Sequence, residues 1–295
     1  MRTVYLGTSE FAAGVLRSLA ASPHRPALVV TRPDRPRGRG RRLAAPPVAV
    51  AAGELGIDLD QPQSVNDDSA RDRIAAARPD VVCVCAFGAL IKEPLLSAYE
   101  MLNVHPSLLP RWRGAAPVER AIMAGDERTG VSIMRLTEGL DSGPVCAQAP
   151  EPIGDQDTYG TLADRLRATG GELLISVLDE RPPCRDQDEA QATYAEKLTA
   201  ADRVLDPGRP AVELERAVRA LSPHIGAAVM LAGGSRLGVW QARIVDRAGL
   251  EPGALSLDGP LPALGCSPGA LELLVVQPPG GRAMPAGDYL RGRRG

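Results

Sequence analysis

Asn103, His105 and Asp141 place an amide, an imidazole and a carboxylate within residues 103–141 of this 295-residue chain. An amide can donate a hydrogen bond to a developing oxyanion, and an imidazole can transfer a proton near neutral pH. A carboxylate can orient the imidazole and favour its charged form. Together these groups can move an acyl unit onto an amine without a covalent intermediate.

The spacing of these residues supports a common site. Asn103 and His105 are two positions apart, so their side chains share one face if the backbone is extended. His105 follows an expected strand at residues 101–104 and lies in a turn bounded by Pro106 and Pro110. A lone histidine is more often structural, and an aspartate between glycine-rich neighbours is commonly an Asx-turn residue. Their co-occurrence favours the catalytic interpretation.

The elements that must position these groups alternate between strands and helices. The pattern predicts strands at residues 3–6, 27–31, 80–86, 131–135 and 145–149. It predicts a helix capped by Ser9 and ending at Leu19, and further helices at residues 46–55, 115–124 and 162–178. Such alternation favours a doubly wound, Rossmann-like α/β domain, which we expect over residues 1–185.

A second domain is expected after a change in composition near residues 181–183. The polar residues 186–206 predict an interdomain linker, although a long surface loop of one larger domain is the alternative. One helix is expected at residues 212–221. Short strands separated by Gly and Pro follow at residues 227–231, 237–245, 253–257 and 271–277. This spacing favours a smaller antiparallel, OB-like β-barrel over residues 207–295.

Composition limits the partners and the compartment. The net charge of −2 gives no global attraction to nucleic acid, so any such attraction must come from a local patch. No apolar run approaches the roughly 18–20 residues that span a bilayer, and no signal-peptide pattern precedes the first strand. We therefore expect a cytoplasmic protein with no membrane partner.

The five cysteines are odd in number and lack CxxC spacing, which favours a reducing compartment over a disulfide framework. Cys83 and Cys85 alternate in an apolar run, so we expect small core residues on one face of a buried strand. A metal site is the alternative, but no Cys or His cluster completes it. We expect no bound metal.

The first expected strand-to-helix turn does not fit a dinucleotide-binding site. Gly7 and Gly14 are separated by residues without the G-x-G-x-x-G spacing that allows close approach of a pyrophosphate. Residues 38–40 read Gly-Arg-Gly but lack the context of a P-loop. A nicotinamide-dependent enzyme is therefore disfavoured.

Residues 31–42 concentrate positive charge in a segment that also contains two prolines and two glycines, so neither a regular helix nor a central strand is expected. We interpret the segment as a mobile arm that contacts phosphates through guanidinium groups. The alternative is a solvated loop in an arginine-rich protein. The six arginines are Arg32, Arg35, Arg37, Arg39, Arg41 and Arg42.

Residues 103–117, Asn-Val-His-Pro-Ser-Leu-Leu-Pro-Arg-Trp-Arg-Gly-Ala-Ala-Pro, resemble the signature of the folate-dependent formyltransferases, especially the branch that acts on methionyl initiator tRNA. Further similarity lies at residues 7–12, 31–42, 86–88, 193–198 and 273–284. The chain departs from the family pattern at Pro106, where glycine is usual, and at Pro144, where aspartate is common. Pro106 fixes one φ and removes one donor, but it leaves the three chemical groups in place.

The resemblance implies transfer of a formyl group from 10-formyltetrahydrofolate to the α-amine of methionyl initiator tRNA. Nothing in the sequence demands more than a monomer, and activation of the attacking amine requires no metal. Asn103 and His105 would stabilise the oxyanion of a tetrahedral intermediate, and Asp141 would assist proton transfer. Phe11 would lie near the methionyl side chain. Arg39 would contact tRNA, with Arg35, Arg37, Arg41 and Arg42 as companions. The folate site would be lined by Ser107, Leu108, Leu109, Pro110, Phe87 and Gly88.

Two other functions compete with this one. A formyltransferase for a small amine, such as an amino sugar, would need neither the arginine-rich segment nor the C-terminal barrel. A non-catalytic RNA-binding protein on the same scaffold would not need His105. The acceptor preference and the effect of replacing His105 separate the three hypotheses.

Overall fold

The computed structural model describes residues 1–37, 42–231, 233–247 and 249–294. The chain divides into two compact units. The first comprises Met1–Gly114, Thr129–Glu151 and Ala163–Tyr194, and the second comprises Ala115–Arg128, Pro152–Leu162 and Ala195–Gly295. The predicted boundaries at residues 185 and 206 therefore stay predictions, because two internal segments cluster with the C-terminal residues.

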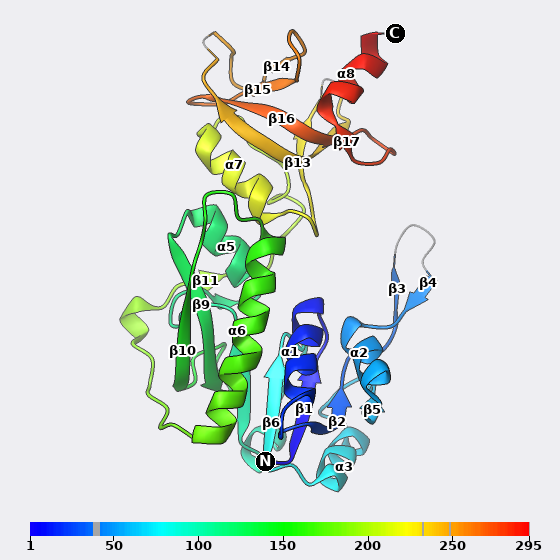
Figure 1. The fold of residues 1–295 in the computed structure, drawn as a ribbon, viewed down its shortest axis with the longest axis vertical. Helices are drawn as coiled ribbons and strands as arrows, with labels where there is room; N and C mark the ends of the chain where they lie inside the picture. Colours follow the sequence, from blue (N-terminus) through cyan, green and yellow to red (C-terminus); the bar gives the residue numbers. More distant parts are fainter. Residues whose placement is uncertain (38–41, 232, 248, 295) are drawn as a thin grey trace. The chain divides into compact units, whose positions relative to one another are not determined.

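The first unit is built on a seven-stranded sheet with the order β10-β9-β7-β6-β1-β2-β5 (Figure 1). Neighbouring strands from β5 to β7 run parallel, and β9 runs antiparallel to β7. The predicted α/β class is confirmed. The strands are β1 (Thr3–Gly7), β2 (Pro26–Val30), β5 (Leu59–Asp60), β6 (Val81–Cys85), β7 (Met101–His105), β9 (Arg128–Arg135) and β10 (Val145–Pro152).

The helices begin and end as local chemistry dictates. Helix α1 (Glu10–Ala20) begins at Ser9, whose side chain accepts a hydrogen bond from the Ala12 amide, as expected of an N-cap. Helix α2 (Pro47–Leu55) begins with a proline and ends at Gly56 in the left-handed conformation. The other helices of residues 1–180 are α3 (Asp68–Ala77), α4 (Leu95–Ala98), α5 (Pro117–Ala124) and α6 (Tyr159–Glu180).

Helix α3 was not predicted from the sequence. Its ten residues bury only Ala70 and Ile74, so the apolar periodicity that reveals an amphipathic helix is nearly absent. Strand β6 differs from α3 in its burial. All five residues of β6 are buried, and Cys83 and Cys85 are 0 % exposed, which confirms that both are core residues.

The arginine-rich segment contains two short strands, β3 (Arg35–Arg37) and β4 (Arg42–Ala44), which pair antiparallel with each other. They form a separate two-stranded sheet, in agreement with the expectation that this segment is not a central strand. Residues 38–41, which include Arg39 and Arg41, lie outside the described residues.

The second unit contains an antiparallel sheet with the order β12-β13-β16-β15-β14, and β17 pairs with β16 (Figure 1). Its core includes Leu214 and Val218 of α7 together with Val239, Leu271 and Leu273 of the sheet. The predicted antiparallel character is confirmed. The elements are α7 (Ala211–Ala220), β12 (Ala227–Met230), β13 (Arg236–Val245), β14 (Leu255–Ser256), β15 (Ala263–Gly265), β16 (Ala270–Gln277), β17 (Met284–Pro285) and α8 (Ala286–Arg294).

The segment between α6 and α7 is polar but not featureless. It contains a 3₁₀ turn, η1 (Glu189–Gln191), and a short strand, β11 (Tyr194–Ala195). Strand β11 pairs with β8 (Arg113–Gly114), which lies within the signature at residues 103–117. The residues between Cys184 and Tyr194 therefore belong to the surroundings of the candidate site.

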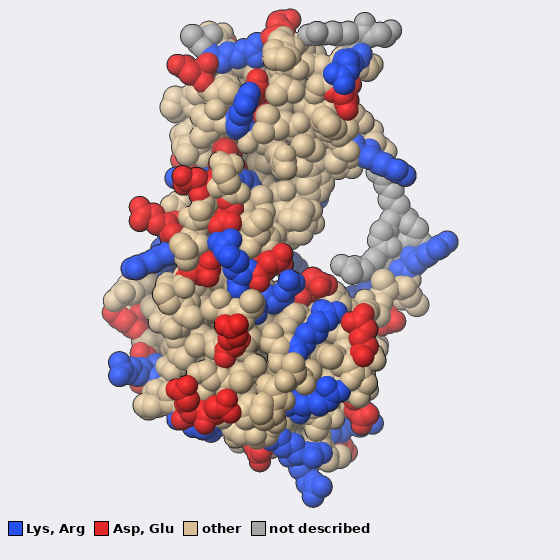
Figure 2. Space-filling model, in the orientation of Figure 1, with Lys and Arg blue, Asp and Glu red and all other residues tan. Residues whose placement is uncertain are grey.

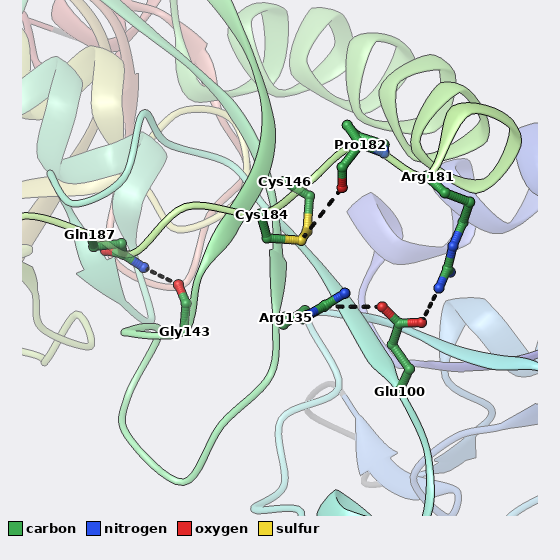
Figure 3. The surroundings of a disulfide bond; sticks show 8 residues. All are labelled: Glu100, Arg135, Gly143, Cys146, Arg181, Pro182, Cys184 and Gln187. Carbon is green, nitrogen blue, oxygen red and sulfur yellow. Dashed lines mark hydrogen bonds and ion pairs between the residues drawn. A yellow bond between two sulfur atoms is a disulfide. The ribbon is translucent and has the colours of Figure 1, made fainter.

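The expectation of unpaired cysteines is wrong for two of the five. Cys146 and Cys184 form a disulfide across a sequence separation of 38 residues (Figure 3). The adjacent Val145 and Arg185 exchange two backbone hydrogen bonds, of 2.8 and 2.9 Å, which bring the two chain segments together. The pair forms only because the chain returns to β10 after α6. No short cysteine motif in the sequence predicts it.

Thiol counting tests this pairing. Unfolding without reductant is expected to expose the three free thiols of Cys83, Cys85 and Cys266, and unfolding after reduction to expose all five. Five thiols without reductant would contradict the pairing.

In the native protein, burial raises the pKa of Cys83 and Cys85 to about 12, so we expect neither to be alkylated near neutral pH. Because unfolding restores ordinary thiol ionisation, these two groups should lower stability progressively as the pH rises from about 9 to about 12.

No helix in the described part of the chain is both long and apolar enough to cross a membrane.

Candidate active site

Strand β7 carries Asn103 and His105 at positions i and i+2, with the spacing that the sequence predicted. The strand extends one residue further than expected, so His105 lies in the strand and not in the turn after it. Both residues are buried, at 8 % and 4 % exposure. Strand β9 lies antiparallel beside β7 and pairs Met134 with Asn103 and Ser132 with His105. A central strand with a neighbour on each side fixes the backbone that carries the amide and the imidazole.

Asp141 lies beside both of these groups. The Asn103 Nδ2 is 3.5 Å from Asp141 Oδ1, and the His105 Nδ1 is 3.7 Å from Asp141 Oδ2. The amide of Gly114 donates a 2.8 Å hydrogen bond to Oδ2. The Asp141 side chain is only 13 % exposed. The structure therefore joins all three predicted catalytic residues through one carboxylate.

The hydrogen bonds of His105 define its protonation pattern. Its Nε2 is 2.8 Å from the carbonyl oxygen of Trp112. A carbonyl can only accept, so this nitrogen carries a proton. The Nδ1 is the ring nitrogen that faces Asp141. A proton exchanged during a reaction would therefore move at Nδ1, beside the carboxylate.

The turn after β7 is held by internal hydrogen bonds. The Ser107 hydroxyl donates to the Arg111 carbonyl at 2.6 Å. The Ser132 hydroxyl donates to the Ser107 carbonyl at 2.6 Å and accepts from the Leu109 amide at 3.1 Å. Gln148 donates to the Leu109 carbonyl at 2.8 Å. These bonds account for the position of the apolar turn relative to β7 and β9.

The departure at Pro106 is compatible with this turn. The Ser107 amide donates a 2.9 Å hydrogen bond to the His105 carbonyl, which spans Pro106 as in a γ-turn. The inverse form of that turn requires a φ close to the value that proline fixes. At the second departure, the Pro144 carbonyl accepts from the Arg135 amide at 2.9 Å, an interaction that needs no amide on residue 144.

The predicted folate-site residues do not all face the same space. A cleft of about 620 Å³ is lined by Phe87 and Gly88, and its lining includes Arg32 and Arg35. Residues 107–110 do not line this cleft, and neither do the three candidate catalytic residues. Phe87 is 5 % exposed and packs in the core, while its carbonyl accepts a 2.7 Å hydrogen bond from Thr8.

The cleft combines apolar surface with charged groups of both signs, because Glu10 lines it together with Arg32 and Arg35. Most of its lining is proline, alanine and other apolar surface, which can cover a flat ring. Arg32 and Arg35 supply positive charge for a carboxylate. Phe11, the residue predicted near the methionyl group, is 8 % exposed and belongs to the buried face of α1.

The predicted tRNA-contacting arginines are only partly described. Arg35 and Arg42 are exposed on the β3–β4 pair, and Arg37 belongs to β3. Arg39 and Arg41 lie outside the described residues. Figure 2 shows basic and acidic side chains interspersed over the face drawn, which agrees with the near-zero net charge.

Two residues near the site were missed by sequence reasoning. Arg113 is 1 % exposed and pairs with Glu189, and Gln187 donates to the Asp141 carbonyl at 2.8 Å. Arg113 lies inside the recognised signature, so its position was a usable signal. Gln187 lies in a polar stretch that resembled a linker, and its contact spans 46 residues.

In the described part of the chain, no group of three or more His, Cys, Asp or Glu residues is arranged to hold a metal ion.

Comparison with known proteins gives a consistent result. Residues 1–178 match the family model "Formyl transferase", and residues 197–294 match "Formyl transferase, C-terminal domain". The chain is 44 % identical to the methionyl-tRNA formyltransferase of Methylococcus capsulatus, over 98 % of this chain and 96 % of that protein. It is also 44 % identical to the methionyl-tRNA formyltransferase of Halorhodospira halophila, over 99 % and 96 %.

Solved structures support the fold. HypX from Aquifex aeolicus in complex with tetrahydrofolic acid superposes with a TM-score of 0.66 at 18 % identity, over 98 % of this chain and 47 % of that chain. An N-formyltransferase from Helicobacter canadensis, in complex with folinic acid and dTDP-3-aminofucose, superposes with a TM-score of 0.66 at 12 % identity, over 92 % and 98 %.

The two family models together span nearly the whole chain, and the relatives match it from end to end at a level that establishes common ancestry. The chain therefore belongs to the formyltransferase family of enzymes.

Proposed function

We propose that this enzyme transfers the formyl group of 10-formyltetrahydrofolate to the α-amine of methionyl initiator tRNA. The observation that carries the proposal is the contact of Asp141 with both Asn103 and His105 at the end of β7. The acceptor follows from the relatives named methionyl-tRNA formyltransferase, which match both domains at up to 44 % identity.

The reaction begins when the α-amine attacks the formyl carbon and the formyl oxygen becomes an oxyanion. Asn103 has a second N–H besides the one directed at Asp141, and this N–H donates to the oxyanion. Protonated His105 stabilises the same charge. The attacking amine loses a proton to Asp141, directly or through a water molecule. The tetrahedral intermediate then expels N10 of tetrahydrofolate, which receives a proton through His105 Nδ1.

The donor binds with its ring against the apolar lining that includes Phe87 and Gly88, and with its carboxylate end toward Arg32 and Arg35. The turn containing Ser107, Leu108, Leu109 and Pro110 shapes the wall beside the formyl group. Because a model α-amine has a pKa near 8, part of the acceptor is already neutral at physiological pH. Metal activation of the amine is therefore unnecessary.

The arginine-rich segment supplies the contact with the acceptor RNA. Arg39 is the main contact, and Arg35, Arg37, Arg41 and Arg42 add to it. Phe11 lies close to the methionyl group. The proposed catalytic domain covers residues 1–185, and the proposed tRNA-binding barrel covers residues 207–295. The enzyme acts as a monomer in the cytoplasm, where charged tRNAs are used.

Replacing Arg39 by alanine tests the RNA contact. We expect a higher KM for methionyl initiator tRNA and a weaker salt dependence of kcat/KM, because one guanidinium–phosphate contact is lost. The measurement is the rate of tRNA formylation over a series of salt concentrations. Arg73→Ala removes one exposed cation from α3 and serves as the matched control. A salt-independent rate together with a silent Arg39→Ala variant would identify the segment as a solvated loop.

The acceptor assignment is tested by supplying different amines. Formylation of charged initiator tRNA is compared with formylation of free methionine and of an amino-sugar nucleotide, with 10-formyltetrahydrofolate as the donor in each case. We expect a strong preference for the charged tRNA. Equal or better turnover of a small amine would overturn the proposed acceptor.

A further inference from the structure

Gln187 joins the Asp141 turn to a buried arginine. Its Nε2 donates to the Asp141 carbonyl at 2.8 Å and to the Gly143 carbonyl at 2.7 Å. Its Oε1 accepts from Arg113 Nε at 3.0 Å. Figure 3 shows the Gln187 amide directed at Gly143. The Gln187 side chain therefore bonds to the first and the last residue of the turn Asp141–Gly143, and the first of these carries the proposed catalytic carboxylate.

The orientation of the Gln187 amide follows from its partners. Arginine can only donate, so the Gln187 oxygen must face Arg113. The two carbonyls can only accept, so the Gln187 nitrogen must face the turn. Both N–H bonds of the amide are thereby used. In the reverse orientation, the Gln187 nitrogen would face the Arg113 donor and the Gln187 oxygen would face the two carbonyl acceptors, so neither contact could be a hydrogen bond.

Arg113 is itself fixed. It is 1 % exposed, and it makes two hydrogen bonds to the carboxylate of Glu189, at 2.9 and 2.7 Å. The hydrogen bond to Glu189 raises the pKa of Arg113, and the same contact lowers the pKa of Glu189. A two-point guanidinium–carboxylate contact of this kind fixes the plane of the guanidinium and with it the direction of its Nε–H. The Nε of Arg113 donates to Gln187.

The Asp141 turn needs such support. Asp141 has a φ of 47°, in the left-handed region that non-glycine residues seldom occupy. Gly143 passes so close to β9 that a Cβ on it would lie 1.9 Å from the Arg135 carbonyl. Both features require that tertiary contacts hold the backbone.

The segment that carries Gln187 is anchored in turn. Cys184, three positions earlier, is bonded to Cys146 of β10. Arg185 exchanges two backbone hydrogen bonds with Val145. Gln187 is therefore attached to the same sheet that carries Asn103 and His105, and it is not part of a free linker.

We propose that Gln187 is a positioning residue for the Asp141 carboxylate, and that Arg113 directs it. This inference rests on the proposed catalytic role of Asp141. Without the two hydrogen bonds from Gln187, the turn would relax away from the left-handed conformation. The carboxylate would then leave the position in which it contacts Asn103 and His105.

Kinetics of Gln187→Met test the proposal. Methionine keeps the length of the side chain and removes both polar groups. We expect kcat to fall about tenfold, as for the loss of a positioning hydrogen bond, while the KM for the folate donor stays near the wild-type value. Gln187→Glu keeps the acceptor for Arg113 but removes the donor to the turn, so we expect a similar fall. Gln191→Met is the matched control, because Gln191 is exposed and bonds to Asp188.

A double-mutant cycle with Asp141→Ala distinguishes positioning from general destabilisation. If Gln187 acts through Asp141, Gln187→Met has no further effect on kcat once the carboxylate is absent. An equal fall in both backgrounds, or wild-type kcat in Gln187→Met or Gln187→Glu, would overturn the inference. A near-wild-type rate for Asp141→Ala alone would instead reject the proposed function of Asp141, so the two failures are distinguishable. Thermal unfolding of each variant verifies that the fold is retained.

Discussion

His105→Ala is expected to lower the rate of formyl transfer about 10²–10³-fold, with the fold retained. His105 lies between the Trp112 carbonyl, 2.8 Å from Nε2, and Asp141, 3.7 Å from Nδ1. Alanine removes both the charge that stabilises the oxyanion and the nitrogen that moves the proton. Because these interactions develop in the transition state, the loss should appear in kcat more than in KM.

The measurement is single-turnover formylation with both substrates saturating, accompanied by thermal unfolding. His105 is 4 % exposed, so a change in melting temperature would indicate a packing defect in addition to lost chemistry. A stable His105→Ala variant that keeps a near-wild-type rate would reject the mechanism. It would favour a non-catalytic RNA-binding protein on a formyltransferase scaffold.

Asp141→Asn is expected to lower the rate at least about 10²-fold as well. Asparagine has the same shape and retains an oxygen that can accept from the Gly114 amide, which is 2.8 Å from the native carboxylate. It removes the negative charge that faces His105 Nδ1, and it cannot accept the amine proton. The variant therefore isolates the charge of Asp141 from its packing.

Asp141→Asn should also change the pH dependence of kcat. In the wild type, the Asp141 carboxylate lies 3.7 Å from His105 Nδ1, the nitrogen proposed to exchange the proton. Removing its negative charge should change the shape of the pH–rate profile as well as its height. A profile with the wild-type shape and rate would show that the carboxylate only accepts a structural hydrogen bond.

The first half of the site was predictable from sequence because it is local. Asn103 and His105 share a face of β7 by the period of a strand, and the strand itself is short and fully buried. The position of Asp141 was less accessible. It depends on β9 returning antiparallel to β7, with Arg135 opposite Leu102, and on the loop after β9 reaching back along β7 to Asn103 and His105.

The polar segment after α6 shows where sequence reasoning stopped. Its composition resembles a linker, yet Gln187 and Glu189 contact the surroundings of the site through hydrogen bonds to residues more than forty positions earlier. The Cys146–Cys184 pair has the same origin. Contacts of this kind are set by the path of the chain in space, and no periodicity or motif encodes them.

The helices and short strands also differ in whether the sequence predicted them. Helix α1 was predictable from its cap and its buried face, whereas α3 contributes only two buried residues and left no amphipathic signal. Strands β3 and β4 pair locally within a charged segment. The proline and glycine residues of that segment argued against regular structure, so the sequence did not predict these short strands. Local signals thus reveal the elements that bury apolar surface.

The most direct test of the central claim is single-turnover transfer of an isotopically labelled formyl group from 10-formyltetrahydrofolate. We expect the label to reach the α-amine of methionyl initiator tRNA as tetrahydrofolate appears, and at least about 10²-fold faster than it reaches free methionine or an amino-sugar nucleotide, because remote RNA contacts contribute to the reaction. Transfer to a small amine at an equal or greater rate, or no transfer to the charged tRNA, would contradict the account.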